Sequence, residues 1–218
     1  MGEDLMEKNW DKLQSHIYFG MCGGDTKRFN WFMTWMAHII QFPQDRWGVR
    51  AVAVNGPSGS GKSTIFNYLC DVLWEEESRI ALAPARDVFG GFSSVNEKTL
   101  LVVLEGWNSA AHEINPSAFK SLLMDDYFVK EMKGKNAALW ANNMRFALLT
   151  SEKDWQPCDR RIVNFAMDDD PLLDKKVWLA KVHAQMSAGG LETFKEEVET
   201  WVTPPENCWA CLCNTTDV

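Results

Sequence analysis

The sequence predicts an α/β protein in which a parallel β-sheet is flanked by helices. Three observations lead to this fold class. Short, continuous apolar runs have the length of strands that are buried on both faces. Segments with apolar residues at helical spacing alternate with these runs. A glycine-rich stretch joins the first run to the helix that follows it, which is where phosphate-binding loops occur.

In the first half of the chain, the spacing of apolar residues predicts two helices and a strand. A helix is expected where Phe29, Phe32, Met33, Met36 and Ile40 recur at helical intervals, and Pro43 ends it. A buried strand then covers 50–54 and leads into the glycine-rich turn at 56–61. The following helix should bury one apolar face, made of Ile65, Leu69, Val72 and Leu73.

In the second half, buried strands are predicted at 100–104, 146–150 and 162–165, with a helix at 119–124. Residues 127–140 have the pattern of a hairpin whose tip is at 133–136. A helix should begin at 168–171, where three acidic residues precede a proline, and end at Gly189–Gly190. The last helix should bury Leu191, Phe194, Val198 and Trp201.

Length and charge limit the classes of protein that this chain can represent. Its 218 residues suit one domain with small additions, and its composition excludes a disordered chain. We expect a helical N-terminal cap at 1–47, a P-loop ATPase core at 48–167, and C-terminal helices with a cysteine-containing tail at 168–218. Lys and Arg total 22 against 30 Asp and Glu, a net charge of −8. A surface that binds DNA over its whole area is therefore not expected. A local basic groove or channel is still compatible with this net charge.

Neither a signal peptide nor a membrane-spanning run is expected. The first ten residues are acidic and interrupted by charges, and the longest apolar runs are too short to cross a bilayer. These features predict a soluble, cytoplasmic protein that does not associate with membranes.

The stretch from Gly56 to Ser63 fits the phosphate-binding pattern G-x-x-x-x-G-K-[ST], with a strand before it and a helix after it. Glycines let backbone N–H groups surround a phosphate, and the start of the helix adds partial positive charge. Lys62 should reach the β- and γ-phosphates of ATP, and Ser63 should supply a hydroxyl to Mg²⁺. The expected nucleotide-binding residues are Gly56, Pro57, Ser58, Gly59, Ser60, Gly61, Lys62, Ser63 and Thr64.

Polar residues at the ends of two further strands are candidates for catalysis. Glu105 follows an apolar strand and is expected to act on Mg²⁺ and the attacking water; the alternative is an ordinary surface glutamate. Another strand ends at Thr150-Ser151 and is followed by Glu152, where ATPases with an extra strand between the loop strand and the acidic strand place a water-sensing residue. Arg160 and Arg161 could contact the γ-phosphate within the subunit or in a neighbour, or could form a solvated basic turn.

Three clustered cysteines stand apart from this pattern. Cys208, Cys211 and Cys213 have spacing that could bind a metal, but no fourth ligand is near them in sequence. An alternative is a tail with incidental thiols.

An ordered series of short motifs extends across much of the chain, from about 29 to 202. Its members are Trp35–Pro43, Phe89–Phe92, Lys133–Lys135, Asn142, Arg145–Phe146, Thr150–Ser151, Asp159–Arg161 and Ala184–Leu191. In this order they resemble the superfamily 3-type helicase core of phage and plasmid primase–helicase proteins.

This resemblance implies a five-stranded AAA+-like core and an ATP-driven motor on single-stranded DNA, used in replication of a virus or mobile element. It implies a ring-forming homo-oligomer, such as a hexamer. By this resemblance, Glu105 is the acidic residue of the second strand motif, Lys133 and Lys135 belong to the hairpin that grips DNA, and Arg160 and Arg161 lie in the arginine-finger region.

The chain departs from the family pattern at three points. Glu152 replaces the usual Asn, Glu105 is a lone acidic residue between Leu104 and Gly106, and no primase domain precedes the core. The third point suggests a separate primase or polymerase partner, or a chain that is a fragment. Two alternatives to the motor stay open: a small nucleotide-type P-loop kinase, and a nucleotide-binding assembly subunit that hydrolyses slowly or not at all.

Overall fold

A parallel sheet forms the centre of the fold. The computed structural model describes residues 9–45, 49–73, 80–82, 95, 97–107, 116–132, 135–152, 162–167 and 174–202. In these residues the main sheet has the strand order β2-β3-β6-β1-β7, and each pair of neighbours is parallel. Its longer strands are β1 (Ala51–Asn55), β3 (Leu101–Glu105), β6 (Arg145–Thr150) and β7 (Ile162–Ala166), and a three-residue strand, β2 (Ile80–Leu82), forms one edge.

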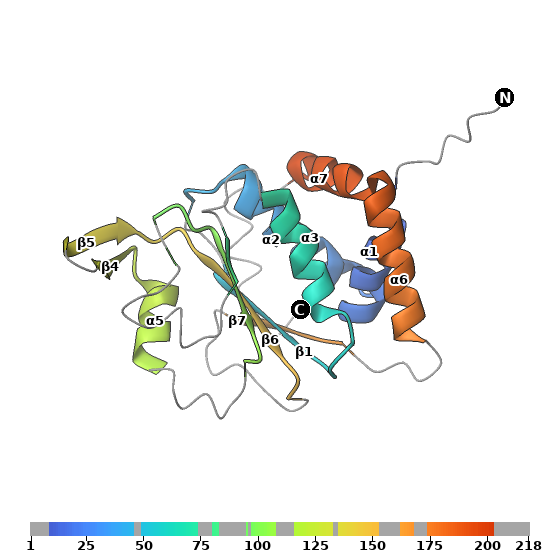
Figure 1. Cartoon of the computed structure of the whole chain (residues 1–218), viewed down its shortest axis with the longest axis horizontal. Helices are drawn as coiled ribbons and strands as arrows, with labels where there is room; N and C mark the ends of the chain where they lie inside the picture. The colour runs from blue at the N-terminus through green and yellow to red at the C-terminus, as the bar shows by residue number, and fades with distance from the viewer. Residues whose placement is uncertain are drawn as a thin grey trace.

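The two faces of the sheet contribute to two separate hydrophobic clusters. Because side chains alternate along a strand, Val52 and Val54 of β1 enter one cluster, and Ala51 and Ala53 enter the other. The first cluster is packed against helices α2 (Thr26–Gln41) and α3 (Lys62–Leu73), and the second against α5 (Pro116–Met124). Figure 1 shows α5 on one side of the sheet and the α2–α3 pair on the other. Helices therefore cover both faces, as predicted.

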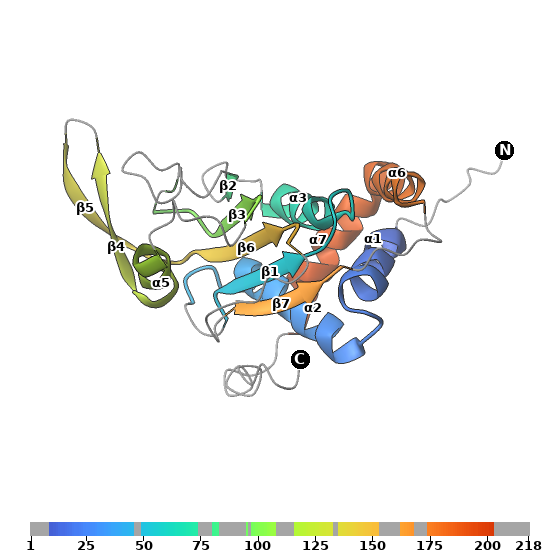
Figure 2. The ribbon, with the colours of Figure 1, turned by 90° about the horizontal axis from the view of Figure 1, so that it is seen from below.

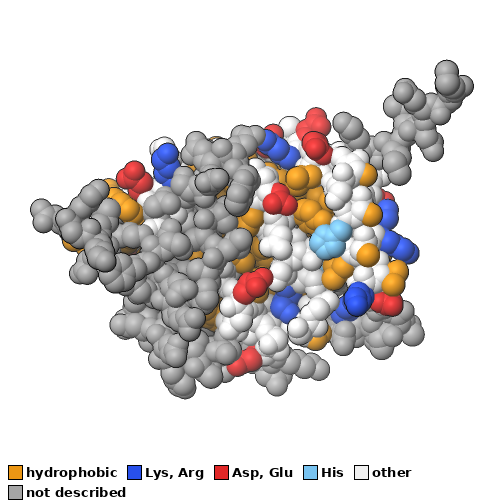
Figure 3. Space-filling view, viewed as in Figure 1, with side chains coloured by type: hydrophobic (Ala, Val, Ile, Leu, Met, Phe, Trp, Pro, Cys, Tyr) orange, Lys and Arg blue, Asp and Glu red, His pale blue; other side chains and the backbone are white. Residues whose placement is uncertain are grey.

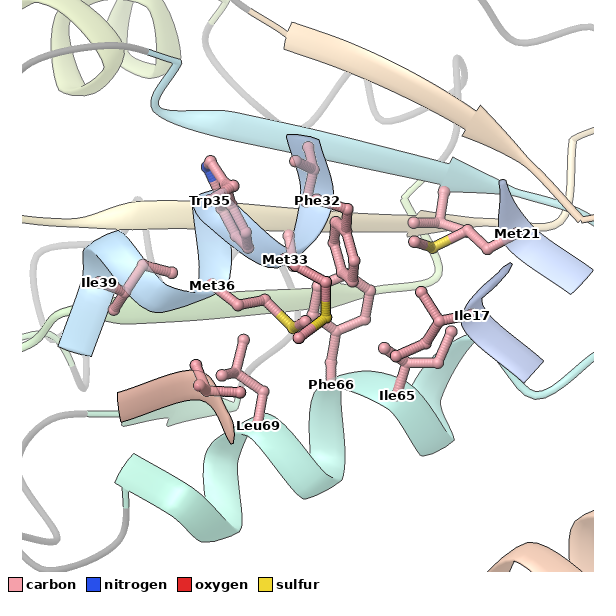
Figure 4. Packing of buried hydrophobic residues seen from close by; sticks show 14 of the residues in the cluster. Ile17, Met21, Phe32, Met33, Trp35, Met36, Ile39, Ile65, Phe66 and Leu69 are labelled. Carbon is pink, nitrogen blue, oxygen red and sulfur yellow. The ribbon is translucent and has the colours of Figure 1, made fainter. Parts of the chain in front are cut away.

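Contacts between aromatic and aliphatic side chains join α2, α3 and the sheet. The rings of Phe32 and Phe66 meet edge to face with centroids 6.0 Å apart, and Phe32 also packs against Phe165 of β7 at 5.5 Å. Figure 4 shows Met33 and Met36 of α2 lying among the side chains of α3. Full burial of each such side chain stabilises the fold by about 1.5–3 kcal/mol.

The chain ends supply a second helical layer beside α3. The N-terminal part forms α1 (Asp11–Ser15) and a π-helical segment, η1 (His16–Met21). The C-terminal part forms α6 (Lys175–Gln185), a kinked segment, η3 (Met186–Gly190), in which Gly189 has a φ of +106°, and α7 (Leu191–Thr200). Figure 1 shows α1 and α6 side by side next to α3, although more than 150 positions separate them. Residues from both ends thus lie next to the start of α3.

A two-stranded antiparallel hairpin, β4 (Tyr127–Met132) and β5 (Lys135–Ala141), precedes β6. Phe128 and Trp140 contact each other edge to face, with ring centroids 5.9 Å apart. In Figure 2 the hairpin projects at one end of the molecule, and the arrowheads of β1, β6 and β7 point to the other end. The hairpin therefore lies away from the carboxyl ends of the strands.

The expected fold class is confirmed as a mixed α/β structure with a parallel sheet, and most predicted elements lie within a few residues of their expected positions. The start of α6 differs: the helix begins at Lys175, where the Asp174 side chain accepts a hydrogen bond from the backbone N–H of Val177 (3.1 Å). The expected start at 168–171 lies outside the described residues. The π-helical segment η1 and strand β2 were not predicted. Within the described part of the chain, no helix has both the length and the apolar character needed to cross a membrane.

Candidate functional site

A glycine-rich loop, residues 56–61, connects β1 to α3 at the carboxyl end of the sheet. Gly59 has φ +80° and Gly61 has φ +92°, conformations that residues with a Cβ rarely adopt. At Gly61 a Cβ would also lie 2.9 Å from Leu179 Cδ2 of α6 and would overlap the His16 ring. Glycine at this position thus allows the loop to pass closely between the N-terminal and C-terminal helices.

Lys62 is the first residue of α3, and its side chain folds back over the loop. Its Nζ donates hydrogen bonds to the carbonyl oxygens of Gly56 (2.6 Å) and Pro57 (2.8 Å), and lies 3.4 Å from Ser60 Oγ. Burial lowers the pKa of Lys62; the charge of Lys175 acts in the same direction, and Glu105 opposes both. The ammonium group is therefore held inside the loop by neutral carbonyl groups, which a phosphate oxygen could replace as its partners.

The ends of two neighbouring strands lie across a crevice from this loop. The crevice has a volume of 360 Å³, and its lining includes Lys62, Ser63, Glu105, Thr150 and Ser151. Glu105 is the exposed last residue of β3, and Thr150 is the buried last residue of β6. Since β6 lies between β1 and β3, the crevice brings the loop, a carboxylate and two hydroxyl groups to one edge of the sheet.

Glu152 comes one residue after Ser151 and is half-buried. Its backbone N–H donates to Thr150 Oγ1 at 3.1 Å, which fixes the direction of the chain as it leaves β6. The Thr150 hydroxyl therefore contacts the backbone of Glu152 at the edge of the crevice that Thr150 lines.

The oxygen donors in the crevice fit a magnesium ion that is also coordinated by phosphate and water. Mg²⁺ prefers hard oxygen ligands and in nucleotide sites uses one or two protein groups with substrate oxygens. The Ser63 hydroxyl and the Glu105 carboxylate, both on the lining, are such groups. The described residues contain no cluster of three or more His, Cys, Asp or Glu side chains that would hold a metal unaided.

His16 of η1 is a buried neighbour of the loop that sequence reasoning missed. Its Nε2 lies 3.3 Å from the Gly61 carbonyl oxygen, and since a carbonyl only accepts, Nε2 carries the proton. Burial lowers the pKa of His16, the Gly61 contact raises it, and the charge of Lys175 lowers it. Nothing in the sequence pattern links residues 16 and 61, because only the tertiary fold brings them together.

Other predicted site residues are outside this crevice or outside the described part of the chain. Lys135 is the first residue of β5, in the hairpin. Lys133, Arg160, Arg161 and the cysteines Cys208, Cys211 and Cys213 lie outside the described residues. The structure thus brings together the loop, Glu105 and the end of β6.

Comparison with known proteins gives a fold but no activity. Residues 54–161 match a family described as "Family of unknown function (DUF5906)". The sequence matches no curated protein.

Several solved structures are similar to this chain. Two structures of the NrS-1 C-terminal region have TM-scores of 0.60 and 0.63 at 16% identity, cover 90% and 100% of this chain, and are themselves covered over 48% and 55% of their length. A JCV helicase bound to a thiazolopyridine-containing acetamide has a TM-score of 0.53 at 14% identity, with 99% of this chain and 61% of that chain covered. The chain therefore spans about half of the NrS-1 region and resembles a helicase domain in fold.

Proposed function

We propose that this chain is an ATP-dependent motor ATPase of helicase type that acts on single-stranded DNA in the replication of a phage or mobile element. The observation that carries the proposal is the crevice in which Lys62 and the loop face Glu105 and the hydroxyl groups of Thr150 and Ser151. This combination of strand, loop, helix and neighbouring carboxylate suits the binding and hydrolysis of a nucleoside triphosphate. The similarity in fold to JCV helicase supports a helicase-type ATPase as the proposed function.

The loop residues would hold the triphosphate of ATP. Backbone N–H groups of 58–61 and the start of α3 would surround the phosphates, and Lys62 would exchange its carbonyl partners for phosphate oxygens. The residues expected here remain Gly56, Pro57, Ser58, Gly59, Ser60, Gly61, Lys62, Ser63 and Thr64. When bound, Mg²⁺ would neutralise phosphate charge, with Ser63 and Glu105 as its protein contacts.

Hydrolysis requires a water molecule to be oriented and partly deprotonated. Glu105 is exposed to the crevice and is our candidate for accepting the proton of that water. Thr150 and Ser151 can donate and accept hydrogen bonds, so they would fix the water, with Glu152 beside them. Arg160 and Arg161 are proposed to stabilise the charge that develops on the γ-phosphate, from this subunit or a neighbour.

The proposed DNA contacts are separate from the proposed ATP site. Lys133 and Lys135 would bind phosphates of the single strand at the hairpin, which projects from the end opposite the strand carboxyl termini (Figure 2). Figure 3 shows acidic and basic side chains interspersed with apolar ones over α3, α6 and α7. With a net charge of −8, DNA binding would have to be local, as a hairpin inside a ring would provide.

We further propose a ring-shaped homo-oligomer, such as a hexamer, that works with a primase or polymerase on a separate chain. A ring would place the hairpins of all subunits around one channel and would let an arginine of one subunit reach the site of the next.

A second candidate function is a nucleotide-binding assembly subunit that hydrolyses ATP slowly. The observation that favours it is that Glu105 is the one carboxylate among the described residues that line the crevice, where it is followed by Gly106. ATP binding without DNA-stimulated turnover would support this alternative.

The experiment that tests the proposed ATP site is turnover by the Lys62→Ala variant. Loss of the ammonium group should lower phosphate release by roughly 10²–10³-fold, the effect of removing a charge-stabilising group. Lys120→Ala, which removes an exposed lysine on α5, is the matched control and should leave turnover unchanged. Full turnover by Lys62→Ala with an intact fold would contradict the assignment.

A further inference from the structure

A second cavity adjoins the glycine-rich loop on the side away from Glu105. It has a volume of 420 Å³, within the range of about 300–1,000 Å³ that is usual for small-molecule sites. Its lining comes from the N-terminal helices, the C-terminal helices and the sheet: Phe19 of η1, Lys175 and Trp178 of α6, and Ala166 and Met167 at the end of β7. No residue of this cavity, apart from Ser60 of the loop, belongs to the site predicted from the sequence.

Two pairs of consecutive residues connect this cavity with the phosphate crevice. In the loop, Ser60 lines the cavity and Gly61 lines the crevice. In α6, Trp178 lines the cavity and Leu179 lines the crevice. The cavity is therefore within reach of the other end of a ligand whose phosphates lie on the loop.

The chemistry of the lining suits a flat aromatic group. Phe19 is 68% exposed, and its ring is contacted edge to face by Tyr18 at a centroid distance of 4.8 Å, which limits its orientation. Trp178 is half-buried, and Met167 is buried at 3% exposure. Aromatic side chains bind nucleobases by stacking, which every base allows. The lysine on the lining, Lys175, adds a positive charge near the path to the phosphates.

From these observations we propose that the cavity binds the nucleobase and ribose of the nucleoside triphosphate, with Phe19 and Trp178 as the aromatic contacts. The proposal rests on the proposed nucleotide binding at the loop and adds the residues that recognise the nucleoside. The N-terminal π-helix and α6 then act together as one nucleoside-binding wall.

The test compares ATP with inorganic tripolyphosphate, which has no base, by calorimetric titration of the full chain in the presence of Mg²⁺. Phe19→Ala should weaken ATP binding at least about fivefold, since each base–aromatic stack contributes on the order of 1 kcal/mol or more. Ala166→Leu, which fills the cavity from the exposed end of β7, should also weaken ATP binding. Neither variant should change tripolyphosphate binding. Phe42→Ala, which removes a 46% exposed aromatic ring at the C-terminal end of α2, is the matched control.

The outcomes separate this proposal from the proposed function. Selective loss of ATP affinity in both variants supports the nucleoside cavity. Equal affinity of the wild type for ATP and tripolyphosphate, or unchanged ATP affinity in both variants, would overturn it while leaving phosphate binding at Lys62 intact. Failure of the wild type to bind either ligand would overturn the proposed function as well.

Discussion

The Nε2 atom of His16 lies 3.3 Å from the carbonyl oxygen of Gly61, the residue that precedes Lys62. This contact ties the N-terminal π-helix to the loop at the point where α3 begins. It leaves a buried imidazole next to a loop that also carries the ammonium group of Lys62. Stability and the proposed ATP binding should therefore both respond to the protonation of His16.

We expect the free energy of unfolding to fall as the pH drops below about 6.5. Burial lowers the pKa of His16 from its ordinary value of 6.5, so below that value the unfolded chain takes up a proton that the folded chain resists. The contribution of the neutral, buried His16 to stability is fully present above pH 6.5, and it is lost as the pH falls towards the pKa of His16 in the folded chain. His38, whose pKa burial also lowers, contributes in the same direction.

His16→Gln is the informative variant for this prediction. The glutamine amide can still donate to the Gly61 carbonyl but does not titrate. In urea unfolding between about pH 5 and pH 8, the free energy of unfolding of this variant should fall less with decreasing pH than that of the wild type. The remaining decrease should come from His38. An unchanged pH profile in His16→Gln would mean that the imidazole is not the titrating group.

Replacing Glu152 by Asn should raise ATP turnover without much change in ATP affinity. An asparagine side chain both donates and accepts hydrogen bonds, whereas an ionised carboxylate only accepts and adds negative charge beside a triphosphate. Two unit charges about 4 Å apart at an effective dielectric near 20 repel by about 4 kcal/mol, before Mg²⁺ and the arginines offset this. An increase of up to about tenfold in kcat is expected, since tenfold needs only about 1.4 kcal/mol of barrier.

Steady-state phosphate release is the measurement, with Glu97→Asn at an exposed turn as the matched control. A lower kcat in Glu152→Asn would sink this idea and would indicate that Glu152 shares the proton-accepting or metal-binding role with Glu105.

The hairpin lysines should account for part of the salt dependence of DNA binding. Removing one lysine that binds a phosphate of a single strand should reduce the slope of log affinity against log salt by about 0.7. We expect the Lys133→Ala, Lys135→Ala double variant to reduce the slope by about 1.4, twice that amount, in fluorescence titrations with a labelled oligonucleotide. Substitution of Lys27 and Lys120, which lie on α2 and α5, is the control. An unaltered slope in the hairpin variant would indicate a solvated hairpin tip.

Sites shared between subunits should give complementation. If Arg161 acts on the ATP of a neighbouring subunit, an Arg161→Ala protein mixed with a Lys62→Ala protein forms some interfaces with both groups present. The mixture should recover part of the ATP turnover that each variant lacks alone. A fully active monomer at all concentrations would argue for the kinase alternative.

Much of the fold follows from local sequence patterns. Four strands are largely continuous apolar runs, at 51–55, 101–105, 145–150 and 162–166. Helices α2 and α3 have apolar residues at regular helical spacing. These strands and helices could therefore be predicted from the sequence. The segment 11–21 mixes polar and apolar residues over two short helical pieces, and β2 has only three residues, so neither carries a clear periodic signal.

The sequence likewise indicates some residues of the candidate site and not others. The loop and Lys62 are contiguous in sequence, and Glu105 and Thr150 each end a recognisable strand, so the pattern indicates them directly. His16, Trp178 and Leu179 reach the loop only because the helices at 11–21 and 175–200 pack beside α3. Such long-range contacts leave no spacing signal in a single sequence.

The central claim is tested most directly by ATP hydrolysis measured with and without single-stranded DNA, with the solution mass determined in the presence of ATP. The account predicts that an oligomer releases phosphate, that single-stranded DNA stimulates this release, and that Lys62→Ala lowers it by roughly 10²–10³-fold. Turnover that DNA leaves unchanged, together with transfer of phosphate to a nucleoside monophosphate by a monomer, would contradict it.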